Sequence, residues 1–419
     1  MDRIKIHGGV KLQGNVRIQG SKNAALPILA AALLTEGESV LYNVPKISDV
    51  DKMLKVLACM GCSIRYVDNG IRIQNCYQEE QEIPDELITG MRSSMYMLGV
   101  CLGCGRNVSM RYPGGCVIGS RPMDMHLQAL EKMGARFQIY EDRIYADTEG
   151  RLHGAQIVLR FPSVGATENV ILAAVLARGR TTIWGAAMEP EVTALCKYLN
   201  ACGARIQGVG TSVIQIDGVS GMKGSSFSIP GDRIVAGTYM FMTAMTGGCG
   251  LFEGIQAEEL EEVLHLLKRA GCEYQIGTEG IFLDAPEKLL PVKKIETQVY
   301  PGFPTDLQSQ ALVLGIKMTG RTVIEENIFE NRFQIVDQLR LMGADIEMLN
   351  SRSAAVSGIK ALKGCVVEAE ELRGGAALVA AGLIAEGVTS VEGCHYIDRG
   401  YENICKDLRE LGARIYRDK

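Results

Sequence analysis

The stretch Leu127-Gln-Ala-Leu-Glu-Lys-Met-Gly134-Ala-Arg-Phe137 carries the pattern from which the fold is predicted. Its apolar residues recur every three or four positions, as on one face of an amphipathic helix. Gly134 stands where this helix would end, because glycine readily adopts the left-handed conformation of a C-terminal cap. The alternation of apolar and polar residues after it is typical of a strand. The stretch therefore predicts a helix, a glycine turn and a strand.

The same pattern recurs six times along the chain, about 70 residues apart. A second, more apolar helix is expected before each copy, and it too ends at a glycine. A buried helix and a half-exposed helix over a sheet form an α/β layer, so we predict an α/β fold built from six repeats of the βαβαββ type. The expected apolar helices are residues 24–34, 95–102, 169–177, 238–246, 308–318 and 376–385. The glycines that end the two helices of each repeat are Gly37 and Gly61, Gly105 and Gly134, Gly179 and Gly203, Gly248 and Gly271, Gly320 and Gly343, and Gly387 and Gly412.

Six repeats most simply group three and three, which places a domain boundary near Ile229-Pro230-Gly231. We expect one domain at residues 21–229 and a second formed by residues 1–20 together with residues 230–419. Residues 1–20 are predicted to be a pair of strands. They could complete the last repeat, whose final strand otherwise lacks partners.

The composition is that of a globular protein, with 47% hydrophobic and 22% charged residues among 419, enough for two or three domains. Because 44 basic residues face 49 acidic ones, we expect no nucleic-acid or membrane partner. Thirteen cysteines and an N-terminus without a signal-peptide pattern indicate free thiols in the cytoplasm. Cys101 and Cys104 have CxxC spacing but no second ligand pair, so we expect core residues and no metal. The longest apolar run, residues 23–34, is too short to span a bilayer.

The second repeat is about five residues longer than the others, and the extra residues fall in a stretch rich in glycine and proline. This stretch is Tyr112-Pro113-Gly114-Gly115-Cys116-Val117-Ile118-Gly119-Ser120-Arg121-Pro122. A thiol beside an arginine on an exposed loop has the setting that makes a cysteine reactive. Most cysteines in reduced proteins are instead small apolar residues. Both interpretations stay open for Cys116, although long insertions on regular scaffolds often carry function.

Cations stand near the starts of four apolar helices, where they oppose the helix macrodipole; they are Lys22, Arg92, Arg233 and Arg373. Free backbone N–H groups with added lysine and arginine form an anion-binding surface. Arg121 and Arg399 could extend this surface, which would suit a ligand with several negative charges. Asp306 stands among these cations, either as a base or as a simple N-cap carboxylate. Ser163 has the plain explanation of an N-cap.

Motifs that contain these residues closely resemble the UDP-N-acetylglucosamine enolpyruvyl transferase family, of the EPSP synthase superfamily. They are Ser21-Lys22-Asn23-Ala24-Ala25-Leu26-Pro27, Pro113-Gly114-Gly115-Cys116 to Arg121-Pro122-Met123-Asp124-Met125-His126, Phe303-Pro304-Thr305-Asp306-Leu307-Gln308, Phe329-Glu330-Asn331-Arg332-Phe333 and Ile397-Asp398-Arg399-Gly400-Tyr401-Glu402. The likeness runs from end to end, and the cysteine loop separates this branch from the sister family that acts on shikimate 3-phosphate. It implies an inside-out α/β barrel with two three-repeat domains, an active site in the cleft between them, and the first committed step of peptidoglycan synthesis.

By this resemblance, the chain transfers the enolpyruvyl group of phosphoenolpyruvate to the 3-hydroxyl of UDP-N-acetylglucosamine, through a tetrahedral ketal that loses phosphate. Cys116 would protonate the methylene carbon and also form a covalent adduct, Asp306 would take the hydroxyl proton, and Lys22 and Arg399 would assist. These two small molecules are the implied partners, with no metal or other cofactor. The residues implied for phosphoenolpyruvate are Lys22, Asn23, Arg121, Arg373 and Arg399. Those implied for the UDP-sugar are Asn23, Arg92, Arg121, Pro122, Met123, Asp124, Met125, Ser163, Val164, Gly165, Asp306 and Ile328, with Asp232 and Glu371 in support.

Two residues depart from the family pattern. The family usually has aspartate in the element that is Glu371-Leu372-Arg373 here, and it commonly has lysine where this chain has Phe161, with Arg160 as a neighbouring substitute. An extra methylene moves a carboxylate by about 1 Å, and misplacements of that size can cost about 10²-fold in rate. Two alternatives therefore stay open: a paralogue with an altered acceptor, and a catalytically silent regulator that binds UDP-sugars.

Overall fold

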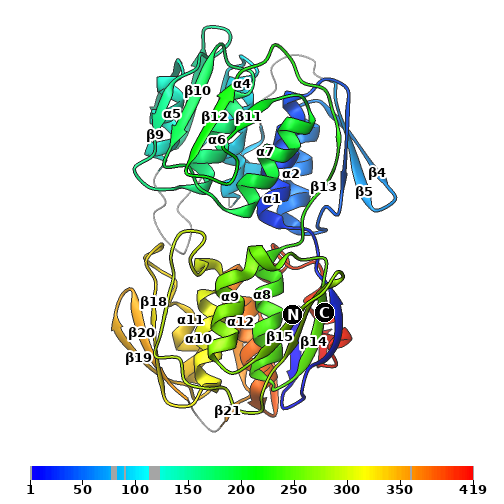
Figure 1. Ribbon diagram of the computed structural model, residues 1–419, viewed down its shortest axis with the longest axis vertical. Coiled ribbons are helices and arrows are strands. Elements are labelled where there is room, and N and C mark those ends of the chain that lie inside the picture. Colours follow the sequence, from blue (N-terminus) through cyan, green and yellow to red (C-terminus); the bar gives the residue numbers. More distant parts are fainter. Residues whose placement is uncertain (1, 77–82, 89–90, 113–122, 359–360, 419) are drawn as a thin grey trace. The chain divides into compact units, whose positions relative to one another are not determined.

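The computed structural model describes residues 2–76, 83–88, 91–112, 123–358 and 361–418. These residues form two compact units (Figure 1). One contains the chain up to Gln19 together with what is described from Gly231 onward, and the other contains the described residues from Gly20 to Pro230. We call them the terminal unit and the inserted unit, because the second is inserted in sequence between the two segments of the first.

The inserted unit alternates apolar helices, amphipathic helices and short strands, and in Figure 1 its strands flank the helices α1, α2, α6 and α7. In chain order its elements are α1 (Lys22–Ala31), η1 (Ala32–Leu34), β3 (Glu38–Tyr42), α2 (Ser48–Cys59), β4 (Cys62–Val67), β5 (Gly70–Asn75), α3 (Asp85–Ile88), η2 (Arg92–Met95), α4 (Tyr96–Gly103), β6 (Val108–Arg111), α5 (Asp124–Lys132), β7 (Ala135–Tyr140), β8 (Arg143–Thr148), β9 (Gln156–Val158), α6 (Val164–Ala174), β10 (Arg180–Trp184), α7 (Pro190–Ala201), β11 (Arg205–Gln207), β12 (Val213–Asp217) and β13 (Ser226–Ser228).

The terminal unit follows the same plan, with the helices α8, α10 and α12 packed against one another at its centre. Its elements are β1 (Arg3–His7), β2 (Gln13–Arg17), α8 (Arg233–Met245), β14 (Cys249–Glu253), η3 (Ala257–Leu260), α9 (Glu261–Arg269), β15 (Glu273–Ile276), β16 (Gly280–Asp284), β17 (Lys294–Glu296), η4 (Thr305–Leu307), α10 (Gln308–Lys317), β18 (Arg321–Glu325), α11 (Ile335–Leu341), β19 (Asp345–Asn350), β20 (Ser353–Ser357), β21 (Leu362–Lys363), β22 (Val366–Glu368), α12 (Leu372–Ile384), β23 (Ala385–Glu386), β24 (Val388–Glu392), α13 (Cys394–Ile397), α14 (Ile404–Glu410) and β25 (Arg414–Asp418).

In each four-stranded sheet, three strands belong to one repeat and the fourth, at an edge, is contributed by another repeat. In the sheet β17-β18-β20-β19, β17 comes from the preceding repeat and pairs with β18 in parallel, while the other neighbours are antiparallel. The same order holds in β13-β3-β5-β4, β9-β10-β12-β11, β2-β14-β16-β15 and β22-β24-β1-β25. In the last of these, β1 lies between β24 and β25, with Ile4 opposite Val391 and Arg417. The prediction that the N-terminal strands complete the last repeat is therefore confirmed for β1.

The predicted helices are present, and several begin earlier than their apolar runs. α6 begins at Val164 and α8 at Arg233, about five residues before the predicted starts, because Ser163 and Asp232 cap them. All six glycines after the amphipathic helices have positive φ, from 87° at Gly61 to 103° at Gly203. The position predicted for Gly248 was wrong by one residue, since Gly247 has the positive φ there.

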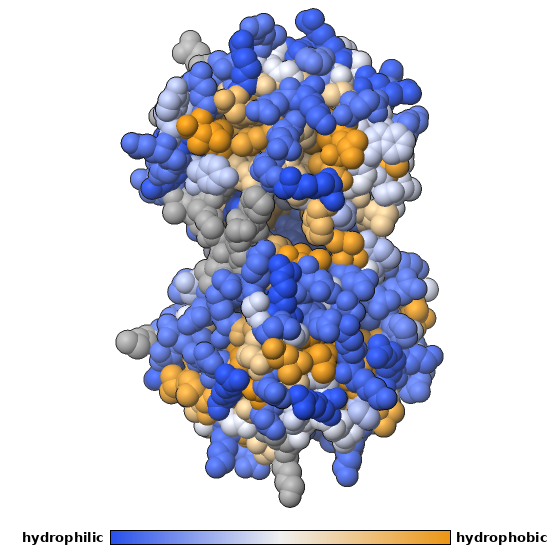
Figure 2. Space-filling model, turned by 90° about the vertical axis from the view of Figure 1, so that its left-hand side faces the viewer, coloured by the Kyte–Doolittle hydropathy of each residue, from blue (hydrophilic) through white to orange (hydrophobic). Residues whose placement is uncertain are grey.

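Each unit has its own hydrophobic core, made mainly by the apolar helices and the inner faces of the sheets. Cys101 lies in the core of the inserted unit, as predicted, and is 2% exposed. The face drawn in Figure 2 is mostly hydrophilic, with separate small groups of apolar side chains. Within the part of the chain that the structure describes, no helix is both long and apolar enough to cross a membrane.

Candidate active site

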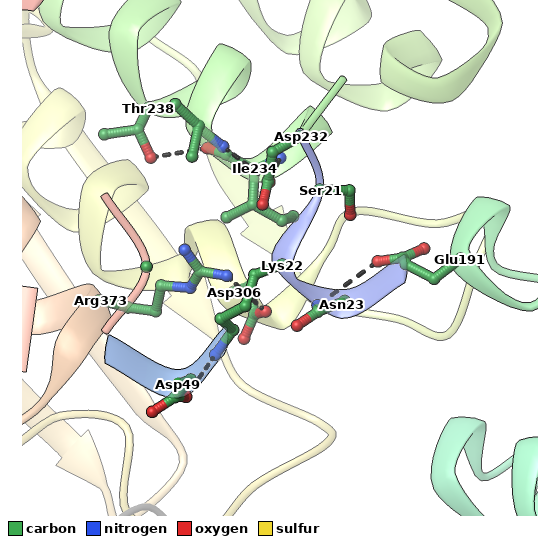
Figure 3. Close-up of polar contacts among 12 residues, drawn as sticks. Ser21, Lys22, Asn23, Asp49, Glu191, Asp232, Ile234, Thr238, Asp306 and Arg373 are labelled. Atoms are coloured by element: carbon green, nitrogen blue, oxygen red, sulfur yellow. Dashed lines mark hydrogen bonds and ion pairs between the residues drawn. The ribbon is translucent and has the colours of Figure 1, made fainter. Parts of the chain in front are cut away.

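Asp306 lies in η4, just before the inner helix α10, and two arginines hold its carboxylate. Arg332 Nη2 donates to Asp306 Oδ1 at 2.7 Å, and Arg373 Nη2 donates to Asp306 Oδ2 at 3.1 Å (Figure 3 shows the second pair). The N-caps of η4 and α10 are Pro304 and Leu307, neither of which makes a side-chain cap. Asp306 is therefore not an N-cap carboxylate, and that interpretation was wrong. The two guanidinium groups favour the ionised carboxylate, which is the form that can accept a proton.

Arg373 is almost completely buried, with 3% of its surface exposed. Burial alone would lower the pKa of Arg373, but the neighbouring Asp306, Tyr401 and Asp232 raise this pKa above its ordinary value. Its Nη1 is buried and has no acceptor among the described residues. A charged, buried N–H group of this kind is suited to an anionic ligand.

Glu371 caps the helix α12 with its side chain. Its carboxylate accepts from the backbone N–H of Arg373 at 2.8 Å and from that of Gly374, and its Oε2 lies 3.9 Å from Arg332 Nη1. The longer side chain that departs from the family pattern thus satisfies two N–H groups at the start of the helix that carries Arg373. Glu371 and Asp306 share Arg332 as a cationic neighbour.

Asp232 and Arg233 begin the inner helix α8. Asp232 Oδ1 accepts from the N–H groups of Ile234 at 2.9 Å and Val235 at 3.1 Å, so it is the N-cap (Figure 3). The guanidinium carbon of Arg233 lies 5.6 Å from the centre of the Tyr300 ring, a cation–π contact. The cation at this helix start therefore has an aromatic partner.

Ile328 and Arg399 lie near the same helix starts of the terminal unit. The N–H of Ile328 donates to Glu326 Oε1 at 2.8 Å, and Glu326 Oε2 accepts from Thr305 Oγ1 at 2.9 Å, which ties Ile328 to η4. Arg399 is half-buried and follows α13, which packs against α12. The terminal unit thus brings Asp232, Asp306, Ile328, Glu371, Arg373 and Arg399 to one group of helix starts.

Lys22 and Asn23 open α1 in the inserted unit, after the N-cap Ser21. Lys22 Nζ lies 3.6 Å from Asp49 Oδ2, and Asn23 Nδ2 donates to Glu191 Oε1 at 3.4 Å (Figure 3). Asp49 and Glu191 begin the amphipathic helices α2 and α7, both of which contact α1. The carboxylates of the outer helices therefore orient the polar side chains at the start of the inner one.

Six of the residues implied for the UDP-sugar lie at or beside the starts of α5 and α6; they are Met123, Asp124, Met125, Ser163, Val164 and Gly165. Ser163 caps α6 by accepting from the N–H of Ala166 at 3.4 Å, so its capping role is confirmed, and Val164 and Gly165 form the first turn. Asp124 begins α5 and pairs with Arg160, the residue next to Phe161. Arg92 begins η2, which contacts α6, while Met123 is buried and Met125 half-buried beside Asp124. Phe161 is 40% exposed.

Cys116, Arg121 and Pro122 lie outside the described residues. Among the described cysteines, burial raises the pKa of Cys62, Cys101, Cys196 and Cys272 to about 12. These thiols are inert near neutral pH, because the thiolate is the reactive form.

Four partner residues in the site were not predicted from the sequence; they are Asp49, Glu191, Glu326 and Arg332. Arg332 stands within the motif Phe329-Glu330-Asn331-Arg332-Phe333, so a signal for it was present. Asp49 and Glu191 stand in the first turns of amphipathic helices, where acidic residues are common for reasons of helix polarity. Their sequence positions alone do not distinguish them from ordinary surface carboxylates.

The model of the EPSP synthase (3-phosphoshikimate 1-carboxyvinyltransferase) family matches residues 6–408. The chain therefore belongs to this family. It is 44% identical, over the whole of both chains, to UDP-N-acetylglucosamine 1-carboxyvinyltransferase 2 of Caldanaerobacter subterraneus subsp. tengcongensis and to UDP-N-acetylglucosamine 1-carboxyvinyltransferase of Nitratidesulfovibrio vulgaris. The resemblance seen in the sequence motifs is thus confirmed.

Solved structures agree on the fold. The enolpyruvyl transferase NikO from Streptomyces tendae has a TM-score of 0.89 at 23% identity, covering 100% of this chain and 99% of that one. An EPSP synthase from Acinetobacter baumannii has a TM-score of 0.77 at 18% identity, covering 100% of both chains. The predicted α/β class and the inside-out barrel fold are therefore confirmed.

Proposed function

We propose that this protein transfers the enolpyruvyl group of phosphoenolpyruvate to the 3-hydroxyl of UDP-N-acetylglucosamine and releases phosphate. The observation that carries the proposal is the full-length identity of 44% to proteins named UDP-N-acetylglucosamine 1-carboxyvinyltransferase. The terminal unit supports the proposal, because it places the carboxylate of Asp306 between the buried arginines Arg332 and Arg373. This activity would place the protein at the first committed step of peptidoglycan synthesis, in the cytoplasm.

Asp306 is the proposed base. Its carboxylate would take the proton from the sugar hydroxyl as the hydroxyl oxygen bonds to C2 of phosphoenolpyruvate. Arg332 and Arg373 hold both carboxylate oxygens, so the base is fixed before the substrate arrives. A positioned base or acid typically contributes 10²–10⁴-fold to a rate.

Cys116 is the proposed acid, which would add a proton to the methylene carbon as the C2–oxygen bond forms. The product of this addition is a tetrahedral ketal. Loss of a proton from the new methyl group and cleavage of the C2–phosphate bond would then give the enolpyruvyl ether and inorganic phosphate. Cys116 would also form the covalent adduct with phosphoenolpyruvate.

The charges of phosphoenolpyruvate would be met by cations. Arg373 offers a buried Nη1 with no described acceptor, and Lys22, Arg121 and Arg399 are the other proposed partners. Pre-placed cations stabilise developing negative charge in a transition state without reorganisation. No step needs a metal or a redox cofactor, and the proposal invokes none.

The test is phosphate release from phosphoenolpyruvate, measured on the wild type and on Cys116→Ser with UDP-N-acetylglucosamine or shikimate 3-phosphate as acceptor. We expect release that depends on the UDP-sugar and collapses in the variant. No release from folded protein with either acceptor would contradict the proposal. Binding of the UDP-sugar without turnover would instead support the silent regulator.

A second candidate is the same reaction on an altered acceptor. The observation in its favour is Phe161, which exposes an aromatic ring beside the Arg160–Asp124 pair where the family commonly has lysine. A panel of nucleotide-sugar acceptors compared by kcat/KM separates the two candidates. A preference for another acceptor by tenfold or more would favour this one.

A further inference from the structure

Gln19 is the last residue of the N-terminal segment of the terminal unit, and backbone hydrogen bonds fix its position. Just before it, β2 pairs with β14, and the N–H of Ile18 donates to the carbonyl oxygen of Glu253 at 2.9 Å. The carbonyl oxygen of Gln19 accepts from the N–H of Asp232 at 2.9 Å, and Asp232 is the N-cap of α8. The backbone of Gln19 is therefore tied to the start of an inner helix.

The side-chain amide of Gln19 joins this fixed point to the turn that follows Arg399. Its Nε2 donates to the carbonyl oxygen of Gly400 at 3.1 Å, and its Oε1 accepts from the N–H of Glu402 at 2.8 Å. The orientation of the amide follows from these partners, because a carbonyl oxygen only accepts and a backbone N–H only donates. Both ends of one amide thus bond to a segment that lies 381 and 383 positions further along the chain.

The same turn is packed against two inner helices. The side chain of Tyr401 is 1% exposed, and its hydroxyl oxygen lies 2.9 Å from Thr238 Oγ1 on α8. A Cβ placed on Gly400 would lie 2.8 Å from Cδ2 of Leu372, the first residue of α12. Gln19 bonds the two backbone groups on either side of Tyr401, so it holds the turn in this packed position.

The carboxylate next to Arg399 is engaged by another arginine. Arg417, on the last strand β25, donates from Nη1 to Asp398 Oδ1 at 2.7 Å and from Nη2 to Asp398 Oδ2 at 2.8 Å. Such a bidentate pair fixes the carboxylate as well as balancing its charge. Asp398 therefore competes less with an anionic ligand for its neighbour Arg399.

We propose that Gln19 is a positioning residue for Arg399, because its amide holds residues 400–402 and thereby sets where Arg399 meets phosphoenolpyruvate. This inference rests on the proposed function, in which Arg399 binds that substrate. Gln19 itself touches no substrate. A cation that is held in place in advance loses less conformational freedom when its ligand binds, so the affinity for the ligand is higher.

Gln19→Met is the test variant, because methionine is similar in length to glutamine and lacks both hydrogen-bonding groups of the amide. We expect the KM for phosphoenolpyruvate to rise roughly fivefold to thirtyfold, since two hydrogen bonds that position the turn are lost. The kcat and the KM for UDP-N-acetylglucosamine should stay within threefold of the wild type. Gln275→Met is the matched control and should match the wild type, since Gln275 is exposed on β15.

A double-mutant cycle identifies the residue through which Gln19 acts. In the Arg399→Ala background, adding Gln19→Met should lower kcat/KM for phosphoenolpyruvate by less than twofold, because the side chain to be positioned is already gone. Calorimetric binding of phosphoenolpyruvate to the wild type and to Gln19→Met gives the same comparison without turnover. We expect the dissociation constant to rise by the same factor as the KM.

Three results would overturn the inference. They are an unchanged KM and affinity for phosphoenolpyruvate in Gln19→Met, equal rises in the KM of both substrates, and the same loss in the Arg399→Ala background as in the wild type. The proposed function fails by a different result, which is a wild type that releases no phosphate with UDP-N-acetylglucosamine. Calorimetry then still decides the role of Gln19, and a wild type that binds no phosphoenolpyruvate would reject both proposals.

Discussion

Arg332 and Asp306 form an ion pair at 2.7 Å in which the arginine side chain is 2% exposed and the aspartate 25% exposed. The cation is buried while the carboxylate keeps access to solvent or a ligand. A buried arginine without an anion would be costly, so the pair holds Asp306 in one place. Arg332, which has no proposed chemical role, therefore sets the position of Asp306, the proposed base.

Asp306→Asn should lower kcat by about 10²–10⁴-fold, because an amide cannot take up the hydroxyl proton. The KM for the UDP-sugar should change much less, since the size and the oxygen atom are preserved. Phosphate release under steady-state conditions measures both. Asp337→Asn is the matched control, because Asp337 is exposed and its carboxylate lies 3.3 Å from Arg340, a neighbour on the same helix α11. A kcat of Asp306→Asn within threefold of the wild type would reject the base.

Glu371→Ala should lower the free energy of unfolding by about 1–2 kcal/mol, because two N–H groups at the start of α12 lose their acceptor. Glu371→Asp should stay within about 0.5 kcal/mol of the wild type, because aspartate is also a good N-cap. Urea denaturation of both variants checks the pair. Equal losses for alanine and aspartate would show that the cap is not what stabilises this helix start.

Asp407 should make stability depend on pH. Burial raises the pKa of its carboxyl to about 6, although the hydrogen bond from Tyr239 opposes this shift. The native state therefore holds a proton that the unfolded chain has lost, so the stability from this group is fully present below about pH 4 and is lost as the pH rises through 6.

Asp407→Asn stays neutral and can still accept from Tyr239. As the pH rises from 5 to 7.5, the wild type should lose about 1 kcal/mol of unfolding free energy that the variant keeps. This figure allows for the partial exposure of Asp407. Urea titrations at the two pH values measure this difference. Parallel pH profiles for the two proteins would contradict the assignment.

Gly99→Ala should destabilise the protein by about 2–4 kcal/mol, because its Cβ would lie 2.4 Å from both the backbone oxygen and Oδ1 of Asn169. Gly221→Ala is the control, since its Cβ would meet only Glu36 Oε1, at 3.7 Å, and the change should stay within about 0.5 kcal/mol. Thermal and urea denaturation measure both. A mild effect at Gly99 would mean that α4 and α6 can separate without cost.

The repeat could be predicted from the sequence because its signals are local. Apolar spacing and a capping glycine lie within one helix, and residues such as Gly134 and Gly203 have the positive φ that this pattern requires. The helix starts were predicted less accurately. Ser163 and Asp232 cap α6 and α8, so these helices begin before their apolar runs.

The partners within the site could not be predicted in the same way. Arg332 and Asp306 are 26 positions apart, and Asn23 and Glu191 are 168 apart, so only the packed repeats bring them together. The choice between a capping and a non-capping Asp306 also depended on the backbone, since η4 begins at Thr305. Tertiary pairing of this kind leaves no local pattern in the chain.

The place of β1 between β24 and β25 sets an order on folding during synthesis. The strand leaves the ribosome first, but both of its partners are translated near the end, at Val388–Glu392 and Arg414–Asp418. All the described strands that pair within the inserted unit are translated before Gly231. The nascent chain must therefore keep Arg3–His7 unpaired with its native neighbours while the inserted unit folds, and the terminal unit closes only after the last strand has been released.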